Sequence, residues 1–268
     1  MSPKVTRRFL ELSHGVVHCA CAGEGDAVLL LHQTPRSWDE FRDVLPLLGR
    51  DRRAIALDTP GFGDSAPLPR GSESIEAWAG VAAQLLDALE IPRADVVGHH
   101  TGATIAIELA ASRPERVRSL VLSSAPFAPP EVRAKHARGR AVVDDVARSA
   151  DGAHLLELWR VRAGFYPPGQ IELLERFMID ALRAGPLAAE GHRVVARYEV
   201  EQAVARVRCP VLLIGASADP FAYPNLARLR AALPQAAVEV IEGGTVALPD
   251  QLPREFGDTV QRFLGARR

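Results

Sequence analysis

Short apolar segments alternate with segments of helical periodicity along most of this chain. The apolar segments expected to be strands are residues 16–22, 27–32, 54–58, 94–98, 120–123, 211–215 and 238–241. The helical segments between them are residues 38–48, 75–89, 101–112, 225–233 and 253–264. Several apolar segments lack a polar face, as strands of a parallel sheet covered on both sides do. The alternation therefore predicts an α/β fold with a mostly parallel central sheet flanked by helices.

The alternation stops between residues 127 and 207. This part of the chain has no clear strand, but it has amphipathic helical patterns, for example at residues 155–161 and 171–182. We therefore expect residues 1–126 and 208–268 to form the core, with a helical cap inserted at residues 127–207 between two strands. An insertion of this kind often covers a site at the carboxyl ends of the strands.

One strand runs directly into a helix through the turn Gly-His-His-Thr-Gly-Ala at residues 98–103. Gly98 and Gly102 stand two residues before and two after the apex, His100. This is the pattern of a nucleophile elbow, in which the apex backbone is strained and strand and helix pass too closely for side chains.

Three further segments place polar residues at the ends of expected strands. Residues 30–35 read Leu-Leu-His-Gln-Thr-Pro, and residues 57–65 read Leu-Asp-Thr-Pro-Gly-Phe-Gly-Asp-Ser. Residues 209–219 contain a buried-strand pattern that is followed by Asp219.

Together these motifs resemble the α/β-hydrolase superfamily, in particular its capped esterase, epoxide-hydrolase and carbon–carbon-hydrolase branch. The resemblance extends from Val16 to Leu264. It implies the α/β-hydrolase fold with a helical cap. It also implies a catalytic triad in the chain order nucleophile, acid, histidine, beside an oxyanion hole of backbone amides.

The chain departs from this pattern at two of the three triad positions. The apex is His100 rather than serine, and the last histidine of the sequence, His192, precedes the acid candidate Asp219. Thr245 stands where the resemblance implies the triad histidine. The usual serine–histidine–aspartate mechanism is therefore excluded.

The two replacements are sterically complementary, because a large residue enters the elbow where a small one is usual, and a small residue replaces the bridging imidazole. We expect His100 to turn into the vacated space and pair with Asp219 as a general-base dyad. The backbone N–H groups of Thr34 and Thr101 would form the oxyanion hole. The cavity walls are expected to include His32, Gln33, Trp38, Thr245, Trp159 and Tyr166.

Three classes of function remain open. The first is hydrolysis of a small, mostly apolar ester or lactone, with His100 as a base on water or as a nucleophile. The second is a lyase, cyclase or isomerase of the same fold, since a base beside an oxyanion hole suits enolate chemistry. The third is a pseudoenzyme that binds a ligand without turning it over.

Composition narrows the set of partners. The 32 basic and 33 acidic residues give a net charge of −1, so no overall field attracts nucleic acid or an anionic membrane. The three cysteines favour neither a disulfide framework nor a zinc site, and no dinucleotide-binding fingerprint follows the first strand. No apolar run approaches a membrane span or a signal peptide. We therefore expect a cytoplasmic monomer or homodimer that acts on a small molecule without a cofactor or metal.

Overall fold

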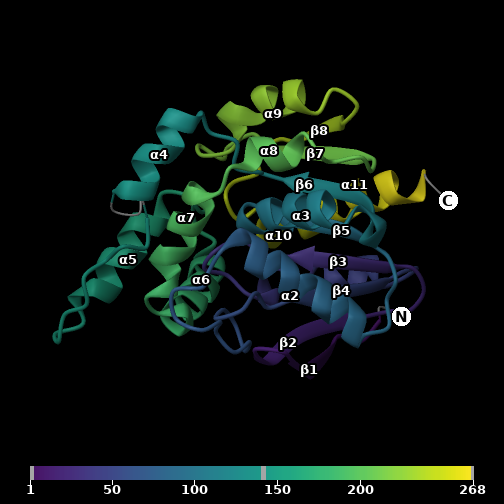
Figure 1. Cartoon of the computed structure of the whole chain (residues 1–268). Helices are drawn as coiled ribbons and strands as arrows, with labels where there is room; N and C mark the ends of the chain where they lie inside the picture. Colours follow the sequence, from purple (N-terminus) through teal and green to yellow (C-terminus); the bar gives the residue numbers. More distant parts are fainter. Residues whose placement is uncertain (1–2, 140–142, 267–268) are drawn as a thin grey trace.

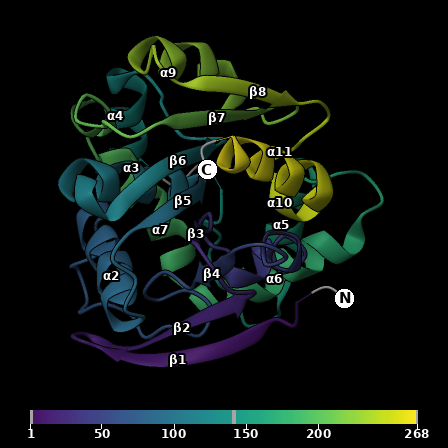
Figure 2. The same ribbon diagram turned by 90° about the vertical axis from the view of Figure 1, so that its right-hand side faces the viewer.

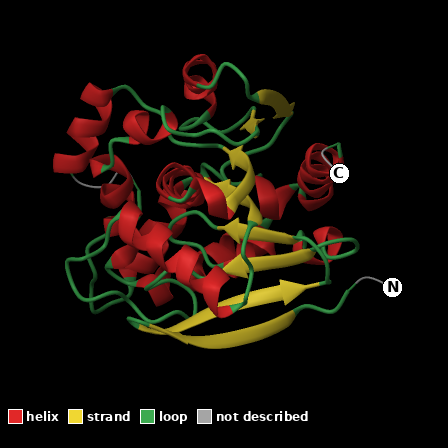
Figure 3. Cartoon of the chain, turned by 45° about the vertical axis from the view of Figure 1, so that its right-hand side comes forward, coloured by secondary structure: helices red, strands yellow, loops and turns green. Residues whose placement is uncertain are grey.

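The computed structural model describes residues 3–139 and 143–266. Within them the strands form one twisted sheet in the order β1-β2-β4-β3-β5-β6-β7-β8 (Figure 3). The strands are β1 Thr6–Leu12, β2 Gly15–Ala22, β3 Ala27–Leu31, β4 Arg53–Leu57, β5 Ala94–His99, β6 Val117–Ser123, β7 Val211–Ala216 and β8 Ala237–Ile241. The strand β2 runs antiparallel to β1 and to β4, and all other neighbours are parallel. The mostly parallel sheet predicted from the sequence is confirmed.

Helices cover both faces of this sheet. In chain order they are α1 Leu45–Leu48, α2 Ile75–Ala88, α3 Thr101–Ser112, α4 Pro130–Arg138, α5 Ala153–Ala163, α6 Ile171–Ala184, α7 Leu187–Arg197, α8 Val200–Val204, α9 Leu226–Ala232, α10 Leu248–Gln251 and α11 Pro253–Gly265. Figure 2 shows α2 and α3 on one side of the sheet and α10 and α11 on the other. In the described residues, no helix is both long and apolar enough to cross a bilayer.

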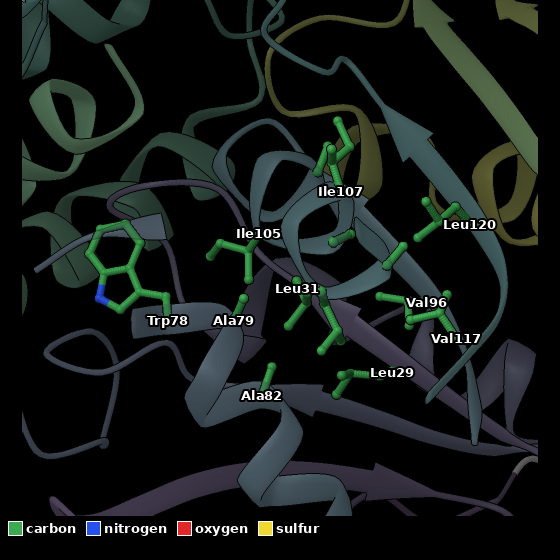
Figure 4. Packing of buried hydrophobic residues seen from close by; sticks show 14 of the residues in the cluster. Leu29, Leu31, Trp78, Ala79, Ala82, Val96, Ile105, Ile107, Val117 and Leu120 are labelled. Carbon is green, nitrogen blue, oxygen red and sulfur yellow. The ribbon is translucent and has the colours of Figure 1, made fainter. Parts of the chain in front are cut away.

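The strand β3 shows why its sequence is apolar without interruption. Leu29 and Leu31 pack with Trp78 of α2 and Ile105 of α3 (Figure 4), and all four side chains are buried. The alternate residues of β3 face the other layer, where they pack with α1 and α11. Because both faces of the strand are covered, neither can carry polar side chains.

Within the described residues, the chain between β6 and β7 contains helices and no strand. The helices α4 to α7 gather beside the sheet, with α5 farthest from it (Figure 1). The last helix of this segment, α8, instead packs against α3 of the core. This segment therefore lies next to the edge of the sheet where β5 and β7 end.

The turn between β5 and α3 is the tightest part of the fold. His100 has a φ of +47°, in the left-handed region, and its carbonyl accepts hydrogen bonds from the N–H groups of Ala103 and Thr104. A Cβ on Gly98 would lie 2.3 Å from the carbonyl oxygen of Gly102, and one on Gly102 would lie 1.9 Å from that of Leu31. Both glycines are required because backbone fills the space that a side chain would need.

The substitution Gly102→Ala should therefore destabilise the protein by about 3 kcal/mol, through overlap with the backbone of β3. The matched control is Gly80→Ala in α2, where an added Cβ meets nothing within 4 Å. This control should be up to about 1 kcal/mol more stable than the wild type, because alanine favours a helix. Chemical denaturation of the three proteins measures both effects. Equal stability of the two variants would contradict the close packing of the elbow.

Candidate active site

His100 and Asp219 meet at the carboxyl edge of the sheet. Asp219 follows β7, and its Oδ2 lies 2.8 Å from Nε2 of His100. The contact is close, but its geometry does not meet that of a hydrogen bond. The other oxygen of Asp219 accepts hydrogen bonds from the N–H groups of Phe221 and Ala222.

The environment of Asp219 keeps its carboxyl group ionised. Burial by itself would raise the pKa of Asp219, but the His100 ring and the two backbone N–H donors outweigh it. The pKa of Asp219 is therefore held well below its usual range. A carboxylate in this place orients an imidazole and stabilises its protonated form.

The imidazole of His100 borders a cavity of about 200 Å³. Its side chain is 12% exposed, and within the described residues Nδ1 has no hydrogen-bond partner. The cavity is lined from the core by Gln33, Thr34, Thr101 and Val246, and from the helical segment by Arg162 and His192, among others. The ring atom of His100 that faces away from Asp219 is thus free to meet a bound molecule.

The two amides expected to form an oxyanion hole also lie at this cavity. The N–H of Thr34 donates a hydrogen bond of 3.3 Å to the hydroxyl of Thr101. The N–H of Thr101 belongs to the first turn of α3, where donors have no acceptor within the helix. The structure brings His100, Asp219, Thr34 and Thr101 together at one place.

Of the residues expected to form the cavity wall, some line the cavity and others do not. Gln33 does line the cavity, and its amide nitrogen donates to Glu40 and to the carbonyl of Val246. His32 is not among the lining residues. It is buried behind the loop, where its Nδ1 faces the carbonyl of Gln33 and its Nε2 accepts from the N–H of Thr59. Its contacts brace the loop.

Four other expected wall residues lie outside the cavity lining, which corrects the sequence-based placement. Trp38 packs with the core layer on the α1 side. Thr245 turns away because its hydroxyl donates to Gln251, and the next residue, Val246, borders the cavity instead. Tyr166 is buried in the apolar interior of the helical segment, where it contacts Phe177, and Trp159 is half-buried and packs against the same cluster.

Sequence reasoning gave little weight to His99, which supports the apex from below. Its Nε2 lies 2.9 Å from the carbonyl of Val246, so this nitrogen carries the proton, and its Nδ1 accepts from the hydroxyl of Ser123 at 2.9 Å. Burial and the neighbouring His100 lower the pKa of His99 to about 3. A neutral ring is thereby fixed edge-on to His100, with ring centres 4.7 Å apart.

A buried arginine joins the loop that carries Thr34 to the helical segment. Arg36 is fully buried and donates to Asp180 of α6, Asp250 of α10 and Asp39. Burial raises the pKa of Asp180 and of Asp250 to about 6, and Arg36 opposes this shift. The arginine thus ties α6 and α10 to the loop that carries Thr34, which lines the cavity.

The helical segment brings a second histidine–aspartate pair to the cavity. Nε2 of His192, on α7, lies 2.8 Å from Oδ2 of Asp144. The guanidinium of Arg162 binds both oxygens of the same carboxylate. Burial raises the pKa of Asp144, but Arg162 and His192 outweigh that effect and lower it to about 2. Neither Asp144 nor His192 was a site residue in the sequence analysis.

Within the described residues, one group of side chains has metal-ligand spacing, namely His18, Asp58 and Asp64. Its ligand atoms are already engaged. Nδ1 of His18 faces Asp58, while Arg7 binds His18 and Asp64, and Arg183 also binds Asp64. Two guanidinium groups beside the carboxylates disfavour a cation there.

The lowered pKa of Asp144 leads to a prediction about how stability depends on pH in acid. The folded-state pKa of about 2 lies below the ordinary value of 3.8, so the carboxylate stabilises the fold fully above about pH 4. That contribution, about 2 kcal/mol, is lost as the pH falls through 2. The free energy of unfolding should therefore drop more steeply between pH 4 and pH 2 in the wild type than in Asp144→Asn. Parallel pH curves would contradict the assignment.

Comparison with known proteins agrees with the fold described above. Residues 26–155 match the family model described as alpha/beta hydrolase fold. The chain is 40% identical over 104 residues to the 2-hydroxymuconate semialdehyde hydrolase of a Pseudomonas species, a match that covers 38% of this chain and 37% of that protein. It is 34% identical over 131 residues to the bifunctional epoxide hydrolase 2 of Mus musculus, covering 45% and 24%. These matches span well under half the length of either relative.

Solved structures match over nearly the whole chain. The meta-cleavage product hydrolase of Pseudomonas fluorescens aligns with a TM-score of 0.79 and 20% identity, over 97% of this chain and 98% of that one. An epoxide hydrolase from an endophytic Streptomyces aligns with a TM-score of 0.79 and 22% identity, over 97% and 95%. The sheet order, the elbow and these matches lead to one conclusion: the chain has the α/β-hydrolase fold, and residues 26–155 match the family model of that fold.

Proposed function

We propose that this protein hydrolyses a small, mostly apolar ester or lactone, with His100 as general base and Asp219 as its orienting partner. The observation that carries the proposal is the 2.8 Å contact between Nε2 of His100 and Oδ2 of Asp219 at the elbow, beside a cavity. The named relatives of the chain are hydrolases, which supports the reaction class.

In the proposed mechanism, Asp219 holds the Nε2 side of the ring, so Nδ1 takes a proton from a water molecule in the cavity. The hydroxide formed attacks the carbonyl carbon of the substrate, and the negative charge moves to the carbonyl oxygen. The N–H groups of Thr34 and Thr101 stabilise that oxygen. Thr34 then exchanges its long hydrogen bond to the Thr101 hydroxyl for one to the oxyanion.

The charges around the cavity favour a neutral substrate. Among the described residues, three arginines border the cavity. Each is already paired with a carboxylate: Arg133 with Glu201, Arg162 with Asp144, and Arg193 with Asp145. Apolar side chains make up much of the remaining lining, including Phe127, Val195, Val200, Phe221 and Val246. An ester or lactone without charge near the carbonyl fits this environment.

A second candidate is a lyase, cyclase or isomerase reaction in which His100 removes a proton from carbon. The observation that favours it concerns Thr101, whose hydroxyl is the nearest one to the apex in the sequence. Thr101 is 5% exposed, and its hydroxyl accepts the hydrogen bond from Thr34, so it is poorly placed to attack a carbonyl. Such a reaction would form product without adding water.

The hydrolase proposal predicts saturable turnover of neutral esters and lactones by the wild type. His100→Ala should lower kcat/KM by about 100- to 10,000-fold, the usual contribution of a general base. The matched control is His154→Ala, because His154 lies on α5 and does not line the cavity. Initial rates on a panel of esters and lactones measure the effect. Activity that survives in His100→Ala would refute the role of His100, and a wild type inactive on the whole panel would refute simple acyl hydrolysis.

A further inference from the structure

The cavity has a histidine–aspartate pair on each of two walls. The core supplies His100 with Asp219, and the helical segment supplies His192 with Asp144. Both imidazoles line the same cavity of about 200 Å³. In that space, one small molecule can contact both rings.

The position of His192 is set by close contact between α7 and the loop that carries Thr34. A Cβ on Gly191 would lie 2.4 Å from Cγ2 of Thr34, so only a glycine lets the helix approach this closely. Figure 1 shows α7 next to the core, with α5 farther out. The residue after Gly191 is therefore held beside the expected oxyanion site.

The chemistry of the ring follows from its partners. Asp144 is ionised and accepts from both ends of the Arg162 guanidinium, so Nε2 of His192 donates its proton to this carboxylate. Within the described residues, Nδ1 of His192 has no recorded partner, and the side chain is 28% exposed. Like His100, the ring turns Nε2 to a carboxylate and leaves Nδ1 available.

His136 also borders the cavity, but it differs from His192. It lies on an exposed stretch of α4, and the described residues place no carboxylate against it. A fixed ring orientation is what proton transfer to a bound substrate requires. His192 meets this requirement and His136 does not.

We propose that His192 is a second catalytic residue, which protonates the leaving oxygen of the substrate while His100 takes a proton from water. The inference rests on the hydrolase function proposed above. In this step His192 starts as an imidazolium, with one proton on Nε2 facing Asp144 and one on Nδ1, and His100 starts neutral. The O–H bond of water breaks as Nδ1 of His100 gains its proton, and the C–O bond to the leaving group breaks as that oxygen gains the proton from Nδ1 of His192. One proton thus moves from His192 to the leaving group and one from water to His100, and exchange with solvent resets both rings.

The test compares two esters of the same acid, a nitrophenyl ester and an ethyl ester. Nitrophenolate leaves without a proton, whereas ethoxide requires one. The substitution His192→Gln keeps an N–H donor for Asp144 but cannot carry the proton. It should lower kcat/KM for the ethyl ester by about 100-fold or more and leave the nitrophenyl ester within about threefold of the wild type.

Three further proteins make the result decisive. His154→Gln, on α5 and outside the cavity lining, should leave both rates unchanged. Asp144→Asn should show the same selective loss of ethyl ester activity as His192→Gln, because the His192 ring is no longer held by a carboxylate. His100→Gln should lose both substrates, so nitrophenyl activity that survives in this variant would refute the proposed function separately.

An equal loss on both esters in His192→Gln would show a structural role and overturn the proposal. An unchanged ethyl ester rate in that variant would overturn it as well. Thermal unfolding of each variant, followed by circular dichroism, shows whether the fold is kept.

Discussion

The turn from β5 into α3 is the constraint on which the rest of the site depends. Backbone of β3 and of α3 occupies the space around Gly98 and Gly102, so strand and helix meet with no side chains between them. This forces the apex residue into the left-handed region and projects it from the end of the sheet, in front of the first N–H groups of a helix. Whatever side chain stands at the apex therefore faces the backbone amides of Thr34 and Thr101 and the carboxylate after β7. In this chain that side chain is an imidazole.

Buried polar contacts around the cavity fix the positions of the Thr34 loop and the helical segment relative to the apex. His99 is kept neutral and joins the apex to the carbonyl of Val246. Arg36 binds carboxylates from α6 and α10, so the loop with Thr34 and the helical segment are tied to one buried cation. Removing one partner from a buried charge network of this kind costs several kcal/mol, which is why such networks fix a geometry. The proposed general-base catalysis by His100 requires that fixed geometry.

The sequence predicted the parts of the structure that depend on local pattern. The uninterrupted apolar strands such as β3, the elbow around His100 and the carboxylate after β7 were all readable, because each combines a periodicity with a turn signal. The strand β1 was missed because most of its residues are exposed, so it carries no apolar pattern. The residues of the cavity wall were harder to predict from the sequence, since they depend on how segments that are distant in the chain pack together. Thr245 and Val246 are neighbours, and only the hydrogen bond from Thr245 to Gln251 decides which one faces His100. The pairing of His192 with Asp144, 48 residues apart, has no local signature.

The central claim is that His100 acts as a base on water, and the time course of the first turnover tests it most directly. A nitrophenyl ester in several-fold excess is mixed rapidly with the enzyme, and release of nitrophenolate is followed through the first few turnovers. We expect linear release from the start, because water attacks the carbonyl directly and no acyl group accumulates on the enzyme. A burst equal to the enzyme concentration, absent in His100→Ala, would contradict it, since it would show that the imidazole itself takes the acyl group.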